Sequence, residues 1–339
     1  MLVHQARLPL AALGLLLTLA LAGSAAGFSS RAAATYSYVA LGDSFSSGEG
    51  VSPYLRDTVD PATGARVNNQ CDRSTRAYAT WVQPPGRSAP LYALASGGGR
   101  PGPGHRYGSD QNVRTSGGIS WAFWACSGAE LGNVLPETLG GLGQGQGTDS
   151  RPQLDNARLA NASLVTLTIG GNDAGFIDVL VRCGLFSCDT PAFRRQRTAR
   201  IDALEPKLET VYRTIAARAP RALILVLGYA QPFPATPAEQ SCSMLRPFAG
   251  EQDMIRALGA RLNGTIAAAV GHVARSGASI RFVPVAARFA GHEVCGRKGA
   301  WMNGIVRSSG GFGIDPGSLH PNLLGQRNGY AAAVNAALR

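Results

Sequence analysis

Ser44 stands in a context that suits a nucleophile. It follows an apolar run at residues 37–41 and the pair Gly42-Asp43, so a strand ends in a turn above which the serine hydroxyl and its backbone N–H can both point. An ordinary turn with Ser44 capping a helix also fits these residues. A phosphate-binding loop is a third interpretation, but no Gly-Lys-Ser or Gly-Lys-Thr follows. Taken alone, this block favours the capped turn.

Three further blocks offer hydrogen-bond donors and a base. Gly128 lets a backbone N–H approach a ligand closely, and Asn172 has a side-chain amide that can donate to a negative oxygen. His320 precedes the last predicted helix, and an imidazole can take the proton of a nearby hydroxyl. Each block by itself also fits a simple turn. Their order along the chain, with nucleophile first, donors next and base last, is specific where the single blocks are not.

Short strands that are apolar on both faces must position these blocks. Such runs occur at residues 37–41, 119–124, 164–169, 222–227 and 280–285. Helical patterns occur at residues 75–82, 173–181, 191–219, 251–274 and 321–338. Alternation of buried strands and helices predicts a parallel sheet covered on both faces, and ligands bind at the carboxyl ends of such strands.

Two stretches are rich in Gly and Pro and have no clear period. We expect residues 84–118 to form a surface excursion that carries part of a substrate wall, and residues 139–147 to form a flexible loop.

The composition indicates one globular domain. Of 339 residues, 45% are hydrophobic and 16% are charged, which excludes a disordered chain. The formal charge of +11 comes almost wholly from Arg, and the densest basic group spans only residues 194–197. Because no recognition motif accompanies this charge, we expect a solvated basic surface and no nucleic-acid partner. Attraction to an anionic lipid interface remains open.

The first residues have the pattern of a signal peptide. Arg7 precedes an apolar stretch at 8–21 and small residues at 22–27, with cleavage expected after Ala26 or Ala34. A membrane-spanning helix needs about twenty apolar residues, and this stretch is shorter. An uncleaved membrane anchor is an alternative. We therefore expect residues 1–34 to be a signal peptide, residues 35–339 to be the mature domain, and the protein to be secreted.

The six cysteines, Cys71, Cys126, Cys183, Cys188, Cys242 and Cys295, suit this compartment. An even number in an exported chain indicates disulfides, and their pairing does not follow from the sequence. No Cys-x-x-Cys or His-x-x-x-His pair occurs, so we expect neither a metal site nor a cofactor.

The ordered blocks resemble the SGNH, or GDSL, hydrolase family of esterases and lipases. The matching residues are Gly42-Asp43-Ser44 with 47–50, then Gly128, then Gly171-Asn172-Asp173, then His320-Pro321. The resemblance runs from about Tyr36 to the end of the chain and is closest to the secreted actinobacterial esterases and lipases. It implies an α/β fold, namely a flavodoxin-like three-layer α/β/α sandwich with a central parallel sheet.

The resemblance also implies roles for these residues. Ser44 would be the nucleophile and His320 the base, while the N–H groups of Ser44 and Gly128 and the Asn172 side chain would form an oxyanion hole. Relatives of this kind often have three disulfides in sequential order. That order implies the pairs Cys71 with Cys126, Cys183 with Cys188, and Cys242 with Cys295.

One position departs from the family pattern. The family's last block is Asp-x-x-His, but Gly317 stands three residues before His320. We expect a backbone carbonyl of Gly317 or Ser318 to hold the Nδ1 proton of His320, with Asp315 as the alternative. Asp43 is expected to stabilise the turn beside Ser44, and Asp173 to cap the helix that begins there.

The sequence therefore predicts a secreted, monomeric serine esterase or lipase that hydrolyses carboxylic esters through an acyl-enzyme. An acetyl-glycan esterase and a phospholipase are alternatives of the same fold. A non-catalytic surface-binding module is a further one, although Ser44, Asn172 and His320 are all present. The aromatic residues near 121–124 and Phe176 suit either the core or an acyl pocket, so the acyl and alcohol parts of the substrate stay open.

Overall fold

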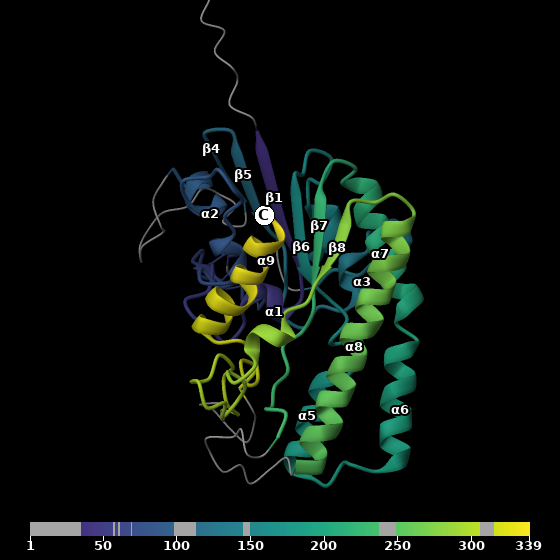
Figure 1. Ribbon diagram of the computed structural model, residues 1–339. Coiled ribbons are helices and arrows are strands. Elements are labelled where there is room, and N and C mark those ends of the chain that lie inside the picture. The colour runs from purple at the N-terminus through teal and green to yellow at the C-terminus, as the bar shows by residue number, and fades with distance from the viewer. Residues whose placement is uncertain are drawn as a thin grey trace, which may run out of the picture. The chain divides into compact units, whose positions relative to one another are not determined.

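A sheet of six strands forms the middle layer of the structure (Figure 1). The computed structural model describes residues 35–56, 58–59, 62–68, 70–97, 113–144, 150–236, 249–305 and 315–339. These residues belong to the compact unit Thr35–Arg339. In spatial order the strands are β4 (Val113–Ser116), β5 (Ile119–Phe123), β1 (Tyr36–Gly42), β6 (Leu164–Thr168), β7 (Leu223–Leu227) and β8 (Ile280–Val283).

The strand order is that of a doubly wound sheet. The edge strand β4 pairs antiparallel with β5. The strands β5, β1, β6, β7 and β8 are parallel to one another. After β1 the chain forms the edge strand β4 and then β5 on one side of β1, and it then builds β6, β7 and β8 outward on the other side. Such a reversal opens a crevice at the carboxyl ends of the strands beside the reversal point, here β1 with its neighbours β5 and β6.

Side chains that alternate along β1 divide the core into two layers. Val39 and Leu41 face one layer of helices, and Tyr38 and Ala40 face the other, all of them nearly or completely buried. The first layer contains α3 (Leu131–Val134), α4 (Gln153–Asn156), α5 (Phe176–Leu185), α6 (Pro191–Asp202), α7 (Glu205–Arg218) and α8 (Ala249–Arg275). The second contains η1 (Tyr78–Trp81), α2 (Leu91–Ala95), η5 (Ala286–Phe289), the π-helical segment η6 (Gly325–Ala331) and α9 (Ala332–Ala337). The structure is thus an α/β/α sandwich, as expected.

Short elements complete the unit. They are α1 (Ser44–Ser47), a two-stranded sheet of β2 (Thr58–Val59) and β3 (Arg66–Val67), and η2 (Glu137–Leu139). The helices α5, α6 and the first half of α8 extend beyond the carboxyl edge of the central sheet (Figure 1). Within the described ranges, no helix combines the length and the apolar character needed to cross a membrane.

All five predicted strands are present with bounds shifted by two residues or fewer. The surface excursion expected at residues 84–118 is wrong for its described parts, 84–97 and 113–118. Leu91 and Tyr92 of α2 are buried, and β4 adds an edge strand to the sheet. The turn between β4 and β5 consists of Gly117 and Gly118, whose φ angles are +54° and +76°. A Gly-Gly pair with positive φ is typical of a two-residue hairpin, and this was the signal for the missed strand.

The predicted helices need more correction than the strands. The helix expected at 191–219 is two helices, since the chain breaks between α6 and α7 at Ala203 and Leu204. The segment 75–82 forms only the 3₁₀ turn η1, and α5 begins at Phe176 after Gly175 instead of at Asp173.

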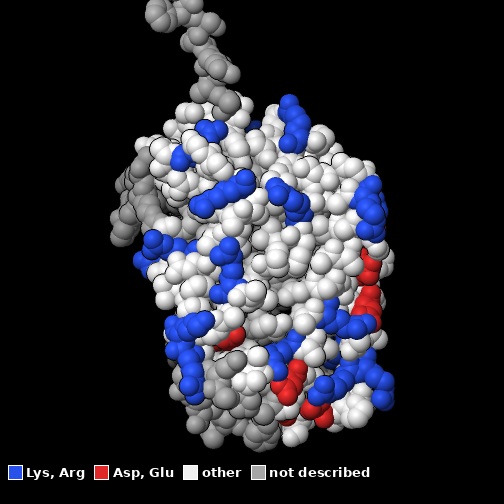
Figure 2. Space-filling model, viewed as in Figure 1, with Lys and Arg blue, Asp and Glu red and all other residues white. Residues whose placement is uncertain are grey.

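Charged side chains are spread over the surface. In Figure 2 the Lys and Arg side chains are scattered across the visible face, and the acidic ones are fewer. Ion pairs such as Arg194 with Asp189 and Arg261 with Asp202 are mostly exposed, and such pairs contribute little to stability. The face in view therefore fits a solvated basic surface.

Gly42, which ends β1, is a position where only glycine fits. Its φ is +118°, and a Cβ atom there would lie 2.3 Å from the carbonyl oxygen of Thr168. We expect Gly42→Ala to lower the free energy of unfolding by about 2–5 kcal/mol, from backbone strain together with the clash. The control is Gly117→Ala, where φ is +54° and a Cβ atom meets nothing within 4 Å, so only the strain of about 1–2 kcal/mol applies. Chemical denaturation measures both, and equal losses would contradict the clash.

Candidate active site

Ser44 and His320 meet at the carboxyl end of β1. Gly42 ends the strand, Asp43 caps α1, and Ser44 is the first residue of that helix. His320 comes from the loop before the C-terminal helical segment, and its Nε2 lies 2.7 Å from the Ser44 Oγ. Both residues are more than 90% buried. A serine hydroxyl in hydrogen-bond contact with an imidazole is the starting arrangement for general-base activation.

The Nδ1 of His320 faces a backbone carbonyl. It lies 3.1 Å from the backbone carbonyl oxygen of Ser318. A carbonyl oxygen can only accept a hydrogen bond, so Nδ1 carries the proton and Nε2 is free to accept one. Asp315 instead accepts the backbone N–H of Gly317 at 2.8 Å, and the carbonyl of Gly317 accepts the Asn303 amide. Of the three candidates for orienting His320, Ser318 is the one whose carbonyl bonds Nδ1.

Gly128 and Asn172 lie in the loops that follow β5 and β6, the two neighbours of β1. Both residues line the same cavity as Ser44 and His320. The Asn172 amide donates to the carbonyl of Ala129 at 2.9 Å, and because an amide nitrogen carries two hydrogens, this bond orients the group and leaves one hydrogen for a ligand. Gly128 has a φ of +75°, which glycine adopts without strain.

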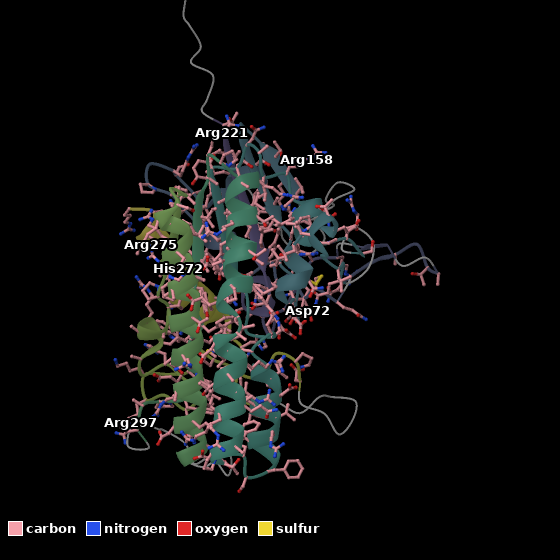
Figure 3. All side chains as sticks on the ribbon, turned by 90° about the vertical axis from the view of Figure 1, so that its right-hand side faces the viewer. Asp72, Arg158, Arg221, His272, Arg275 and Arg297 are labelled. Carbon is pink, nitrogen blue, oxygen red and sulfur yellow. A yellow bond between two sulfur atoms is a disulfide. The ribbon has the colours of Figure 1, made fainter. Side chains whose placement is uncertain are left out.

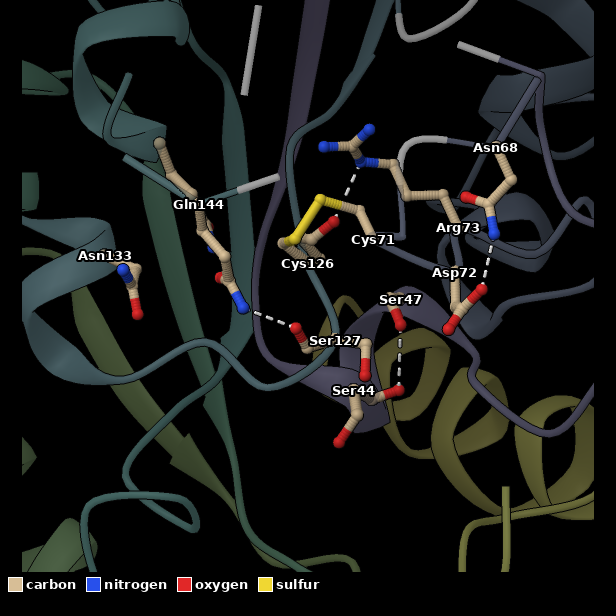
Figure 4. Close-up of a disulfide and its surroundings, with 12 residues drawn as sticks. Ser44, Ser47, Asn68, Cys71, Asp72, Arg73, Cys126, Ser127, Asn133 and Gln144 are labelled. Carbon is tan, nitrogen blue, oxygen red and sulfur yellow. Dashed lines mark hydrogen bonds between the residues drawn. A yellow bond between two sulfur atoms is a disulfide. The ribbon is translucent and has the colours of Figure 1, made fainter. Parts of the chain in front are cut away.

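A disulfide supports the loop that carries Gly128. Cys71 and Cys126 are bonded, and the Ser127 N–H donates to the Cys71 carbonyl at 3.0 Å. Figure 4 shows the side chain of Gln144 donating to the Ser127 carbonyl from the other side. The backbone of Ser127, next to Gly128, is therefore fixed by hydrogen bonds at both its N–H and its carbonyl.

Two disulfides lie within the described residues. Besides Cys71–Cys126, Cys183 of α5 bonds Cys188, five residues further along the chain. Cys295 is also in a disulfide, and Cys242, the partner expected for it, lies outside the described residues.

Asp43 is buried and makes several hydrogen bonds. Its carboxylate accepts the Thr168 hydroxyl at 2.6 Å, the Phe45 N–H at 3.1 Å and the hydroxyl of Tyr229, which in turn accepts the Gly171 N–H at 2.9 Å. Burial raises the pKa of Asp43 to about 6, against the opposing effect of these donors. Asp43 therefore stabilises the turn beside Ser44, as expected, and also joins it to the loop of Asn172.

Asp173 has a different role from the one expected. Its carboxylate accepts the N–H of Leu131 at the start of α3, while α5 begins only at Phe176. It therefore links the loop after β6 to α3, which follows the Gly128 loop.

The cavity that contains Ser44 has a volume of about 370 Å³ and two unlike walls. The polar wall carries the residues described above together with Glu49, Ser127 and Asp315. The apolar wall comes largely from the helices that extend beyond the sheet, and its members are Phe176, Ile177, Leu180 and Val181 of α5, Gly259 and Leu262 of α8, and Phe45, Pro232, Met302, Ile305 and Leu319. An apolar cavity with a few convergent polar groups is typical of a small-molecule site.

Some expected cavity residues lie elsewhere. Trp121 and Phe123 are buried in the core layer of α2 and Trp124 in the other layer, whereas Phe176 does line the cavity. Among the described residues of 84–118, none lines it, so the expected substrate wall is absent from that part of the region.

Sequence reasoning missed Glu49 and Tyr229. Glu49 belongs to the block that follows Ser44, and Tyr229 follows the carboxyl end of β7, which is the place where ligand-binding residues of a parallel sheet are sought. Both lacked a sequence signal for a partner, because their contacts, Ser127 and Asp43, are distant in the chain.

One cluster in the described part of the chain has side chains that could hold a metal ion. It consists of Glu205 and Glu209 of α7 and His272 of α8. Of these three residues, Figure 3 labels His272. The Nδ1 of His272 lies 2.6 Å from Glu209, and Arg213 also bonds Glu209 at 3.0 Å. The cluster forms where the start of α7 meets the last turns of α8, and none of its residues lines the cavity.

The fold and the site together define a class. A doubly wound sheet that brings a hydroxyl–imidazole pair and N–H donors to one cavity at its carboxyl edge has the arrangement of a serine hydrolase. The family model described as GDSL-like Lipase/Acylhydrolase matches residues 40–327. The chain belongs to this family and is a carboxylic ester hydrolase.

Streptomyces proteins are among its relatives. The chain is 30% identical to Lipase 1 of Streptomyces coelicolor, over 94% of this chain and 92% of that protein, and 32% identical to a lipase of Streptomyces rimosus, over 95% of both. Among solved structures it is similar to the extracellular lipase of Streptomyces rimosus (TM-score 0.56, 26% identity, 89% of this chain and 100% of that one). It is also similar to phospholipase A1 of Streptomyces albidoflavus (TM-score 0.56, 28% identity, 89% and 99%).

The position of Asp315 leads to a kinetic prediction. Because its carboxylate bonds the Gly317 N–H and not the His320 ring, Asp315→Asn should lower kcat by less than about tenfold. The control is His320→Gln, which removes the imidazole and should lower kcat by several orders of magnitude. Steady-state hydrolysis of an aryl ester measures both. A loss near 10⁴ in Asp315→Asn would show a carboxylate triad instead.

The burial of His320 leads to a prediction about stability. Burial lowers the pKa of His320 to about 4, from the 6.5 of a free imidazole, so between these values the unfolded chain binds a proton that the folded chain does not. The free energy of unfolding should therefore fall as the pH falls through 6.5 toward 4. Between pH 6 and pH 5 the wild type should lose about 1 kcal/mol more than His320→Gln, as measured by urea denaturation. Parallel pH dependence of the two proteins would contradict the lowered pKa.

Proposed function

We propose that the protein is a secreted serine esterase or lipase that hydrolyses esters with apolar acyl chains through an acyl-enzyme. Ser44 is the nucleophile, His320 is the general base, and the N–H groups of Ser44 and Gly128 with the Asn172 amide form the oxyanion hole. The observation that carries the proposal is the 2.7 Å contact between Ser44 Oγ and His320 Nε2, inside a cavity that Gly128 and Asn172 also line.

The chemistry follows from the positions of these atoms. His320 Nε2 takes the Ser44 proton as Oγ bonds the acyl carbon, and the electron pair of the carbonyl moves to its oxygen. Fixed N–H donors stabilise that oxygen more in the transition state than in the ground state. The imidazolium then protonates the leaving alcohol, and a water activated by the same imidazole releases the acid and regenerates Ser44.

The apolar wall favours lipid-like acyl groups over acetyl. An acetyl group would leave most of the cavity between α5 and α8 unfilled, whereas a longer chain would bury apolar surface there. The lipase and phospholipase A1 relatives point to the same class of substrate. An acetyl-glycan esterase would need polar groups for the sugar, which this wall lacks among the described residues.

The surroundings of the cavity fit action at a lipid interface outside the cell. Ile177, Val181 and Ile305 line the cavity and are also exposed, so they can enter an apolar phase beside the substrate. The net charge of +11 favours anionic surfaces. The signal-like N-terminus and the extracellular relative support secretion.

The direct test is a hydrolysis panel of p-nitrophenyl esters from acetyl to palmitoyl, run with the wild type and with Ser44→Ala. The wild type should prefer acyl chains of medium or greater length, and Ser44→Ala should lose activity by about 10³-fold or more. Ser47→Ala is the matched control, because Ser47 lies on the same helix but bonds the Ser44 carbonyl instead of His320. Wild-type turnover by Ser44→Ala would disprove the nucleophile, and a preference for acetyl would disprove the acyl assignment.

A further inference from the structure

Glu49 is a buried carboxylate in the polar wall of the cavity. Its residue is 4% exposed, and its backbone N–H donates to the Ser44 carbonyl at 3.1 Å. The next residue, Gly50, has a φ of +84° and packs directly on Gly317, since a Cβ atom on Gly317 would lie 2.6 Å from the Gly50 Cα. This close approach of two glycine backbones brings Glu49 against the loop that carries His320.

The carboxylate of Glu49 lies beside the reactive nitrogen of His320. Its Oε2 is 3.8 Å from His320 Nε2, the atom that also contacts Ser44 Oγ at 2.7 Å. The hydroxyl of Ser127, next to Gly128, donates to the same Oε2. Burial raises the pKa of Glu49, and the Ser127 hydroxyl opposes this rise by stabilising the charged form.

Among the residues that the structure describes, no carboxylate bonds Nδ1 of His320, which contacts the Ser318 carbonyl. In a Ser-His-Asp triad one carboxylate both orients the imidazole and stabilises the imidazolium. Here the neutral carbonyl of Ser318 bonds Nδ1 and can orient the imidazole. It has only a dipole, and no negative charge, with which to stabilise the imidazolium. Within the described ranges, Glu49 is the acidic side chain that forms an ion-pair contact with His320.

We propose that the two tasks of the triad carboxylate are divided in this protein: the Ser318 carbonyl orients His320, and Glu49 stabilises its protonated form from the Nε2 side. The inference rests on the proposed function. Glu49 acts through His320 and bonds neither the substrate nor Ser44 Oγ.

The timing of the charge explains why this arrangement would raise the rate. Before reaction His320 is neutral, so Glu49 has little attraction to it. When the Ser44 proton moves to Nε2 and Oγ bonds the acyl carbon, an imidazolium forms 3.8 Å from the carboxylate, and both side chains are buried. When the leaving alcohol takes that proton, the attraction ends. An interaction that exists only around the transition state raises kcat.

Other carboxylates near His320 are engaged elsewhere. Asp315 accepts the Gly317 N–H, and Asp72 accepts the Asn68 amide, as Figure 4 shows for Asp72. Burial lowers the pKa of His320, and the charges of Asp315 and Asp72 act against this from a distance. Asp315 therefore provides a matched control, since it lines the cavity and acts on His320 by its charge but, among the described residues, makes no ion-pair contact with Nε2.

The first test compares Glu49→Gln with Asp315→Asn on a p-nitrophenyl ester of the preferred acyl length. Glu49→Gln keeps the shape and removes the charge, and kcat should fall by about 10- to 100-fold with KM changed by less than about threefold. The loss in Asp315→Asn should be smaller than in Glu49→Gln. Glu49→Asp, which keeps the charge, should recover part of the rate. Wild-type kcat in Glu49→Gln, or an equal loss in Glu49→Asp, would overturn the inference.

The second test measures the pKa of the His320 imidazolium directly. A p-nitrophenyl alkylphosphonate forms a bond from Ser44 Oγ to phosphorus, releases p-nitrophenolate and leaves His320 beside a tetrahedral adduct. NMR titration of that adduct should give a His320 pKa about 1–2 units lower in Glu49→Gln than in the wild type, since a tenfold effect corresponds to one unit. A purely structural role for Glu49 would not move this pKa. If Glu49→Gln does not fold, the wild-type adduct is titrated alone, and a His320 pKa no higher than the 6.5 of a free imidazole overturns the inference.

These outcomes separate the inference from the proposed function. Loss of activity and of phosphonate labelling in Ser44→Ala supports the nucleophile whatever Glu49 does. An unchanged pKa and kcat in Glu49→Gln would remove only the role of Glu49.

Discussion

The buried carboxylate of Asp43 is the constraint on which the site depends. It accepts hydrogen bonds from Phe45 of α1, Thr168 of β6 and Tyr229 after β7, and Tyr229 in turn bonds the loop of Asn172. Leaving such a group without partners costs several kcal/mol, so the ends of three strands are held together by the need to satisfy it. The turn that carries Ser44 and the loop that carries Asn172 therefore share one polar centre.

Around that centre, the strand order brings distant parts of the chain together. β5, β1 and β6 are neighbours in the sheet, so the loops that follow them place Gly128, Ser44 and Asn172 along one edge. The imidazole comes from a fourth segment, the loop before the C-terminal helical segment. The helices α5 and α8 extend past the same edge and supply the apolar wall. A polar end and an apolar end of the cavity thus follow from one topology.

The environment of His320 reflects the cost of burying charge. The imidazole is neutral at rest because burial disfavours its charged form, and a backbone carbonyl is sufficient to hold the right tautomer. In the proposed reaction at Ser44 the charged form of His320 exists only for a moment. The carboxylate of Glu49, near Nε2 and bonded by the Ser127 hydroxyl, lies where it would offset that cost. The disulfide of Cys126 and the glycine contact of Gly50 with Gly317 are what keep these groups in place.

The sequence by itself determined the class of fold and predicted the residues of the reacting pair. Strands apolar on both faces predict a covered parallel sheet, and the order of Ser44, Gly128, Asn172 and His320 along the chain predicts a site that no single block predicts alone. Only the tertiary structure decided the edge strand β4, the break between α6 and α7, the carbonyl that bonds Nδ1 and the position of Glu49. The physical reason is that local patterns record which residues are buried, whereas the partner of a buried polar group lies far away in the chain and is chosen by packing. Glu49 meets His320 because two glycine backbones touch, and the contact of Gly50 with Gly317 has no signature in either segment.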